Sequence, residues 1–466
     1  MCALVCRAMS VPSSWTVQFW PVRPRFVLGL AALLVGAIGL PVVAAGIDES
    51  IPGPARATAP AQRLAPIATD VVSIYNSSVL RADVADAAVA AARQAGASIA
   101  FGRSASVGMV GVYRASAPVQ VPAPGFSYPM GTTVLPPEAV GSTMGRDVSA
   151  LLASDAVVMG ETTAGLRGAR SGDVLALVAG SGGVVSFRVA AVLPDARIGG
   201  TELLMSPEGA DRLGITELRR ALLWNPSSQA AMNAALADNG LVSTSVRIRR
   251  SWDPPDPDGT LGMAGTKALL GEFTYRVNSN GSVSQDGAWV AASLPAGRVL
   301  LNSSIRISAR CHNAIAPALN AALAEVAAAG LGGTIDVGDA NTYGGCHVAR
   351  FNRLTPDSSL GFLSRHSWGM ALDTNTQGSC QGCAPPNFAS RPGGCTTVQI
   401  FRRHGFAWGG NFLTPDGMHF EYVGERRDLQ AYPSRFCPNT AAPALTDVES
   451  GIDTFFASDG MIVGEG

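Results

Sequence analysis

The chain has 466 residues, of which 47% are hydrophobic and 15% are charged. At roughly 150 residues per domain, this length predicts two or three domains, and the composition excludes a disordered chain. The 34 basic and 35 acidic residues give a net charge of −1, so no strongly basic surface for nucleic acid is expected. Lys267 is the only lysine, and arginine therefore carries almost all of the positive charge.

The N-terminal segment predicts export. Arg23 and Arg25 precede an uncharged apolar run over residues 26–45. The run is close to the length of about 20 residues that spans a bilayer, yet the small residues at its end suit signal peptidase. Residues 1–46 are therefore interpreted as a signal peptide or a membrane anchor, in contact with the cytoplasmic membrane in the second case. Because the arginines come first, the rest of the chain is expected outside the cytoplasm, secreted or anchored at the cell envelope.

The positions of the cysteines agree with export. Two precede the apolar run and six fall in the last third of the chain, where an even set is typical of disulfides. The sequence does not select their pairing. A structural zinc site that uses the Cys380-x-x-Cys383 pair and Cys395 is the alternative. The six residues are Cys311, Cys346, Cys380, Cys383, Cys395 and Cys437.

The region before residue 253 shows no catalytic motif. Residues 47–78 are rich in Ala and Pro and predict a linker. Residues 79–252 predict a small α+β domain of unknown role, which contains neither His nor Cys. A helix is expected over residues 83–94, with Asp83 as its cap, and a strand over residues 108–113.

The middle region also contains a predicted hairpin and ends at a predicted domain boundary. Ser181-Gly182-Gly183 separates two alternating runs, 173–178 and 184–192, and predicts a hairpin in which Phe187, Val189 and Ala191 face the core. The Pro-rich and Asp-rich stretch 253–259 suits neither a helix nor a central strand, so a domain boundary is expected there.

Residues 260–440 form the predicted catalytic domain. Asn-Gly and Asp-Gly pairs predict hairpins before residue 300. A helix is expected over residues 315–329, with Leu319, Leu323 and Val326 along one face, followed by a short strand over residues 334–337.

Two short motifs in this region carry the chemistry. His366 and Asp373 lie in Ser-Arg-His-Ser-Trp-Gly-Met-Ala-Leu-Asp, and His419 lies in Asp-Gly-Met-His-Phe-Glu. Two imidazoles and one carboxylate are a ligand set that binds zinc and leaves a fourth position for water. Asp416, three residues before His419, is the candidate general base, and Glu421 is the runner-up because it shares a strand face with His419. The spacing from His366 to Asp373 predicts a turn and then a strand.

These motifs, together with the run Phe-Arg-Arg-His-Gly-Phe-Ala-Trp-Gly-Gly at 401–410, resemble the zinc D-alanyl-D-alanine carboxypeptidase and L,D-endopeptidase family, peptidase family M15, which includes VanY-like enzymes. The resemblance covers residues 300–425. It implies Zn²⁺ at His366, Asp373 and His419, and peptidoglycan stem peptides as the substrate. It also implies catalytic roles for Asp416 and for Arg350, which would hold a substrate carboxylate or stabilise the oxyanion.

The expected fold class is α+β. A C-terminal zinc peptidase domain with a small antiparallel sheet and flanking helices is preceded by a separate small α+β domain, and residues 441–466 form an acidic tail. A D-alanyl-D-alanine carboxypeptidase is favoured. The alternatives are an L,D-endopeptidase, a non-catalytic cell-wall binding module, and a scaffold whose middle domain, faintly similar to extracytoplasmic domains of ABC-type permeases, meets a membrane partner.

Overall fold

The computed structural model describes residues 68–75, 79–241, 246–295, 299–300, 305, 308–336, 346–352, 360–376, 385–429 and 431–439. The predicted signal segment, most of the predicted linker, the acidic tail, Cys380 and Cys383 lie outside the described residues. Among the described helices, none combines the length and apolar character that a membrane span requires. Residues 62–466 cluster as one compact unit, so the separate small domain that the sequence predicts is not confirmed.

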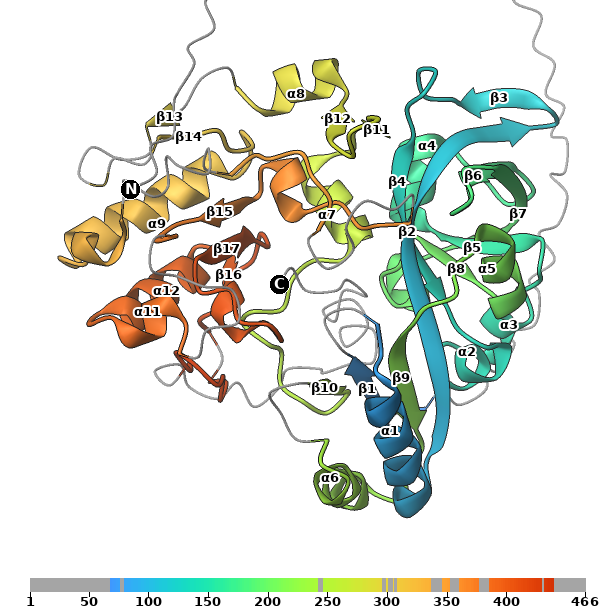
Figure 1. Cartoon of the computed structure of the whole chain (residues 1–466), viewed down its shortest axis with the longest axis horizontal. Coiled ribbons are helices and arrows are strands. Elements are labelled where there is room, and N and C mark those ends of the chain that lie inside the picture. The colour runs from blue at the N-terminus through green and yellow to red at the C-terminus, as the bar shows by residue number, and fades with distance from the viewer. Residues whose placement is uncertain are drawn as a thin grey trace, which may run out of the picture. The chain divides into compact units, whose positions relative to one another are not determined.

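The middle region contains a closed β-barrel within a ten-stranded sheet (Figure 1). Six strands pair in the order β2-β4-β8-β5-β7-β6, and β6 pairs back onto β2, which closes the ring. The strands are β2 Ser98–Arg114, β4 Tyr128–Val134, β5 Ala156–Gly160, β6 Val174–Val178, β7 Val184–Leu193 and β8 Leu203–Met205. Buried apolar side chains fill the barrel, among them Val107, Met130, Val157, Leu175, Phe187 and Leu203.

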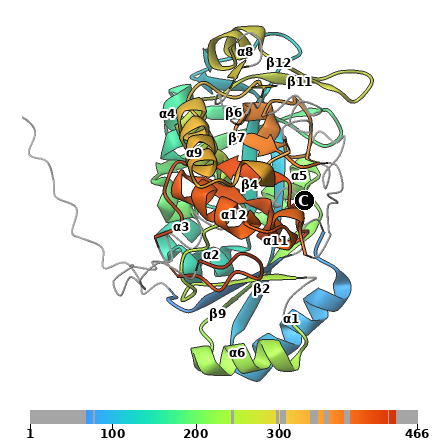
Figure 2. The same cartoon turned by 90° about the vertical axis from the view of Figure 1, so that its left-hand side faces the viewer.

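The long strand β2 also extends the sheet beyond the barrel, in the order β10-β1-β9-β2. The added strands are β1 Val71–Tyr75, β9 Leu218–Trp224 and β10 Arg247–Arg250, while β3 Ala117–Gln120 pairs with β2. Helices α1 Ala82–Ala95 and α6 Gln229–Asp238 lie side by side in both views (Figures 1 and 2) and bury small apolar residues in one core with this extension. The short helices of the region are α2 Pro137–Thr143, α3 Arg146–Ser149, α4 Glu161–Arg167, η1 Asp195–Ile198 and α5 Pro207–Leu213.

Several local predictions for this region are confirmed. The predicted helix 83–94 lies within α1, although Asp83 stands in the first turn and Arg81 is the N-cap. The predicted hairpin is β6–β7, with Val178 paired to Val184. Phe187 and Val189 are buried, whereas Ala191 is half-buried, next to an irregular register between β5 and β7. Barrel closure was not predicted because it depends on pairs that are far apart in sequence.

The C-terminal region holds a small antiparallel sheet flanked by helices. The strand order is β15-β17-β16, and α9 and α12 lie beside each other in Figures 1 and 2. Its elements are α7 Met263–Leu270, β11 Tyr275–Val277, β12 Val283–Gln285, α8 Gly287–Ser293, β13 Val299–Leu300, β14 Ser308–Ala309, α9 Ala316–Ala328, η2 Gly332–Thr334, η3 Arg365–Trp368, β15 Ala371–Asp373, α11 Asn387–Ser390, α12 Gly394–Arg403, β16 Phe406–Trp408, η4 Gly409–Asn411 and β17 His419–Tyr422.

The local predictions here are confirmed in part. The Asn-Gly pair joins β11 to β12, and α9 buries Leu319, Leu323 and Val326 as expected. The Asp-Gly pair does not form a hairpin, because the Asp286 side chain accepts a hydrogen bond from Ala288 and caps α8. The strand expected over residues 334–337 is wrong for residues 334–336, since Thr334 ends η2 and its carbonyl accepts a hydrogen bond from the Asn375 side chain instead of a partner strand.

The polar stretch 253–259 is anchored at two buried carboxylates. Asp256 is bound by Arg249 of β10 at 3.1 Å, and Asp258 is bound by Arg402 of α12. Asp256 is 4% exposed and Asp258 is fully buried. The predicted boundary is therefore held on one side to the large sheet and on the other to the C-terminal region.

The only lysine forms a second buried link. Lys267 on α7 binds Glu202, which precedes β8, at 2.8 Å and Glu272 at 2.6 Å. Arg167 of α4 also pairs with Glu272. All four side chains are buried, so the charges compensate one another away from solvent.

Candidate metal centre

Three side chains from three local elements converge. His366 lies on η3, Asp373 ends β15 and His419 begins β17. Asp373 and His419 are direct partners in the antiparallel register, which places both side chains on one face of the sheet. The turn and strand predicted between His366 and Asp373 are confirmed. Gly369 makes this turn with φ 66°, and a Cβ atom there would lie 2.6 Å from Leu294.

The polar atoms of this cluster lie within a few ångströms of one another. Asp373 Oδ1 is 3.2 Å from His366 Nε2 and 3.1 Å from His419 Nδ1. One potential ligand atom from each residue falls within 4.8 Å of the others. The three predicted ligands therefore lie together in one cluster, and their binding of a metal stays a prediction.

The His366 ring is oriented by the backbone. Its Nδ1 lies 3.1 Å from the Cys346 carbonyl, and with the proton on Nδ1 it donates to that oxygen. Cys346 is bonded to Cys311, so a disulfide holds the acceptor in place. Ser364, the N-cap of η3, accepts a hydrogen bond from the His366 amide. This arrangement turns His366 Nε2 toward Asp373, as a carbonyl partner does for many metal-bound histidines.

The cluster favours an ionised carboxylate. Burial opposes the charge on Asp373, but the neighbouring His366 and His419 outweigh it and hold the pKa of Asp373 well below its usual value. Without a metal, both imidazoles would be expected to donate hydrogen bonds to such a carboxylate. Here His366 Nε2 is buried and makes no well-directed hydrogen bond within the described part of the chain.

The donor set fits a divalent metal. Two ring nitrogens and one ionised carboxylate are the ligands of open, three-residue zinc sites. In the described residues, this is the group of His, Cys, Asp and Glu side chains whose geometry meets that of a metal site. Cys395 is bonded to Cys437, which removes it from the alternative cysteine zinc site.

The two candidate bases lie on either side of His419. Asp416 sits in the turn before β17, where its amide donates to Gly409 and its carbonyl accepts from the His419 amide at 3.2 Å. Its carboxyl Oδ1 is buried. Glu421 shares the face of β17, and its Oε2 is 3.7 Å from His419 Nε2.

Arg365 is a buried residue of the site that the sequence reasoning missed. Its Nε lies 3.3 Å from Glu421 Oε1, and its side chain is 2% exposed. The same guanidinium donates to Thr266 at 3.0 Å and to the Leu261 carbonyl. Its place directly before His366 was the available signal. The pairing ties Glu421 into a structural ion pair, which makes Glu421 a weaker candidate for the base than Asp416.

Other predicted residues lie outside the cluster. Arg350 is half-buried, and its guanidinium donates to the neighbouring Phe351 carbonyl at 3.2 Å, although its backbone carbonyl accepts from Ser364. Its catalytic role stays a prediction. Trp368 and Trp408 are fully buried and belong to the core of this region.

The remaining histidines also have separate surroundings. His404 pairs with Glu325 at 2.8 Å, and His347 pairs with Gln285 at 2.7 Å. His312 Nδ1 accepts a hydrogen bond from the backbone. None of the three belongs to the cluster within the described residues.

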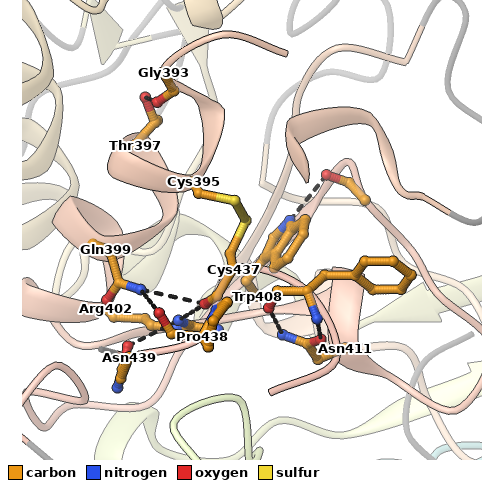
Figure 3. The surroundings of a disulfide bond; sticks show 12 residues. Gly393, Cys395, Thr397, Gln399, Arg402, Trp408, Asn411, Cys437, Pro438 and Asn439 are labelled. Carbon is orange, nitrogen blue, oxygen red and sulfur yellow. Dashed lines mark hydrogen bonds between the residues drawn. A yellow bond between two sulfur atoms is a disulfide. The ribbon is translucent and has the colours of Figure 1, made fainter. Parts of the chain in front are cut away.

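A second disulfide joins α12 to the segment that contains Cys437 (Figure 3). Cys395 of α12 is bonded to Cys437, whose carbonyl accepts from Arg402 at 2.5 Å. The side chain of Asn411 is bonded in both directions to the backbone of Phe436 at 2.9 Å. Trp408 Nε1 donates to the Gly417 carbonyl at 3.0 Å, which fixes the turn that carries Asp416.

Residues 358–422 match the family model of D-alanyl-D-alanine carboxypeptidases, peptidase family M15. This segment is similar to peptidase family M15. The match contains all three clustered ligands and both candidate bases, and it supports a metallopeptidase. It covers a shorter span than the predicted resemblance over residues 300–425, and it does not reach the barrel. No curated protein matches the chain.

Proposed function

We propose that this protein is an exported zinc peptidase that acts on peptidoglycan stem peptides, most simply as a D-alanyl-D-alanine carboxypeptidase. The observation that carries the proposal is the convergence of His366, Asp373 and His419 inside the segment that matches the carboxypeptidase family. Export rests on the apolar N-terminal segment and agrees with the two disulfides.

Different residues of the chain have different roles in the proposed hydrolysis. His366, Asp373 and His419 would hold the metal, which supplies a Lewis acid that polarises water and a carbonyl group. Asp416 accepts the proton of the attacking water and returns it to the leaving amine. Asp416 suits this role because its turn is fixed by backbone hydrogen bonds to Gly409 and His419. Arg350 is the proposed partner of the substrate carboxylate or of the oxyanion.

The test combines metal analysis with hydrolysis of purified stem peptides, read by mass spectrometry. Wild type is expected to contain zinc and to release D-alanine. His419→Ala should lose both metal and activity, whereas Asp416→Ala should keep the metal and lose activity. Glu421→Gln is the matched comparison for the base, and loss of activity in it while Asp416→Ala stays active would reverse the assignment.

Other products would redirect the proposal. An internal cut in the stem peptide would assign an L,D-endopeptidase with the same ligands. Zinc in the wild type without cleavage of any stem peptide would favour a cell-wall binding module.

A further inference from the structure

A large cavity lies between β10 and two segments of the peptidase region. Its volume is about 670 Å³, and it is lined by Arg247–Arg250, by residues 411–413 and by residues 432–435. Four arginines and one aspartate line it. The cavity is therefore rich in positive charge, in a chain whose net charge is −1.

The single aspartate does not neutralise these arginines. Asp256 is already shared by Arg247 and Arg249. Arg250 reaches only Asp253, at 3.5 Å, and its buried Nε makes no hydrogen bond to any described residue. Arg435 is exposed, and in the described part of the chain no carboxylate forms an ion pair with it; its guanidinium lies over the Phe436 ring. Arg435 thus supplies positive charge that an anionic ligand can use, and Arg250 adds to it because its ion pair with Asp253 is long, at 3.5 Å.

Neutral donors complete the wall. Burial, together with nearby Asp256, raises the pKa of Tyr432 to about 12, so its hydroxyl keeps its proton at physiological pH. Ser434 Oγ is buried and has no hydrogen-bond partner among the described residues. Both residues line the cavity. A cavity with these donors suits a carboxylate and not a cation.

The side chain of Phe412 separates the cavity from His419, one of the candidate metal ligands. Phe412 lines it, and the Phe412 ring centroid is 5.7 Å from that of His419. Arg247 donates to the Asn411 carbonyl at 3.0 Å and so joins β10 to the same loop. β10 is the last strand of the large sheet, pairing with β1, and a terminal strand can pair with an extended peptide.

We propose that this cavity binds a carboxylate of the peptide substrate at a position remote from the cleaved bond. This inference rests on the proposed function. It assigns a substrate-binding role to the barrel-containing region through β10, a region that the family match does not include. Arg250 and Arg435 are the specificity residues, while Arg247 and Arg249 are positioning residues held by Asp256.

The experiment uses two stem peptides that differ only by a carboxylate or a carboxamide away from the cleaved bond. Hydrolysis is measured for wild type, for Arg250→Gln/Arg435→Gln and for Arg250→Lys/Arg435→Lys. Binding of both peptides to the metal-free full-length protein is measured by calorimetry. Arg93→Gln, on the exposed end of α1, is the matched control.

Wild type is expected to favour the carboxylate peptide by about tenfold in kcat/KM and in Kd, mainly through KM, since charged hydrogen bonds are lost with the carboxamide. The glutamine variant should bring the ratio near one by raising KM and Kd for the carboxylate peptide, and the lysine variant should restore part of the ratio. Equal ratios in wild type and the glutamine variant would overturn the proposal.

Two other outcomes separate the proposals. Arginine-dependent binding without any cleavage would retain the cavity assignment and reject the peptidase. A glutamine variant that is faster on both peptides alike would show that acidic residues of the chain itself occupy the cavity, which would overturn the assignment.

Discussion

His366 shows how one atom of the site depends on residues remote in sequence. Its Nδ1 lies against the Cys346 carbonyl, and Cys346 is bonded to Cys311 at a sequence separation of 35 residues. If the disulfide were absent, the carbonyl would lose one of the restraints on its position. A hydrogen-bond partner on the second ring nitrogen changes how tightly a histidine binds metal.

We therefore predict that Cys311→Ser/Cys346→Ser lowers zinc affinity by about 10- to 100-fold, because the His366 ring is less well oriented. Competition with a chromogenic chelator measures the change. Cys395→Ser/Cys437→Ser is the matched control, since that disulfide touches no ligand, and it should lower stability with a smaller change in affinity. Equal losses of affinity in both pairs would contradict the prediction.

The Arg365–Glu421 ion pair makes a second prediction at this scale. Arg365→Met should destabilise the protein by about 3–5 kcal/mol, because Glu421 is left buried without its partner. Urea unfolding of the metal-free protein measures this loss. Arg365→Met/Glu421→Leu removes both charges and should recover most of the stability. No recovery in the double variant would mean that packing, and not charge, sets the cost.

At the scale of elements, the stretch 253–259 connects β10 to α7 and is held in place by the ion pairs of Asp256 and Asp258. Burial disfavours the charge on Asp256, but Arg247 and Arg249 outweigh it and lower the pKa of Asp256. A carboxylate whose pKa is lower in the folded state stabilises the fold above its unfolded pKa of about 3.9 and loses that contribution as pH falls through the folded value.

We predict that Asp256→Asn is less stable than wild type at pH 7 and that the difference shrinks as pH falls below about 4 toward the lower pKa of the folded state, because the unfolded chain binds the proton first. Urea unfolding at several pH values measures it. Asp211→Asn, in an exposed ion pair with Arg103, is the control and should change stability little. A difference that stays constant from pH 7 to pH 3 would refute the electrostatic explanation.

At the scale of the whole molecule, Lys267 lies at the contact between the barrel and the C-terminal region that contains α7. It is the only lysine, and its side chain is fully buried between Glu202 and Glu272. An amine reagent can reach it only when the barrel side and the helix α7 side separate or unfold. Its reactivity therefore measures that opening directly.

We expect Lys267 to stay unmodified by an amine-reactive ester in the native protein and to react fully in urea, as read by peptide mass spectrometry. The extent of reaction in urea is the reference for complete labelling. Arg167→Met should speed native-state labelling, since it leaves Glu272 with one buried cation fewer. Rapid labelling of the native wild type would contradict the buried link.

The site was largely predictable because its residues are close in sequence and chemically distinctive. His366, Asp373 and His419 lie in two short motifs, and the turn at Gly369 follows from spacing alone. Arg365 was missed because an arginine beside a ligand carries no local sign of burial. The Asp-Gly pair at 286–287 was misinterpreted because the same residues suit a turn and a helix N-cap, and only the surrounding packing selects between them.

The sequence by itself determined which residues are the candidate metal ligands and the candidate base, together with most of the local elements, because short-range spacing and side-chain chemistry specify them. The tertiary structure decided the barrel, the disulfide pairing and the buried contacts of Asp256, Asp258 and Lys267. It also brought β10 next to the loop of Phe412. These features depend on residues that lie far apart in the chain and become neighbours only after the core has formed, so no local pattern encodes them.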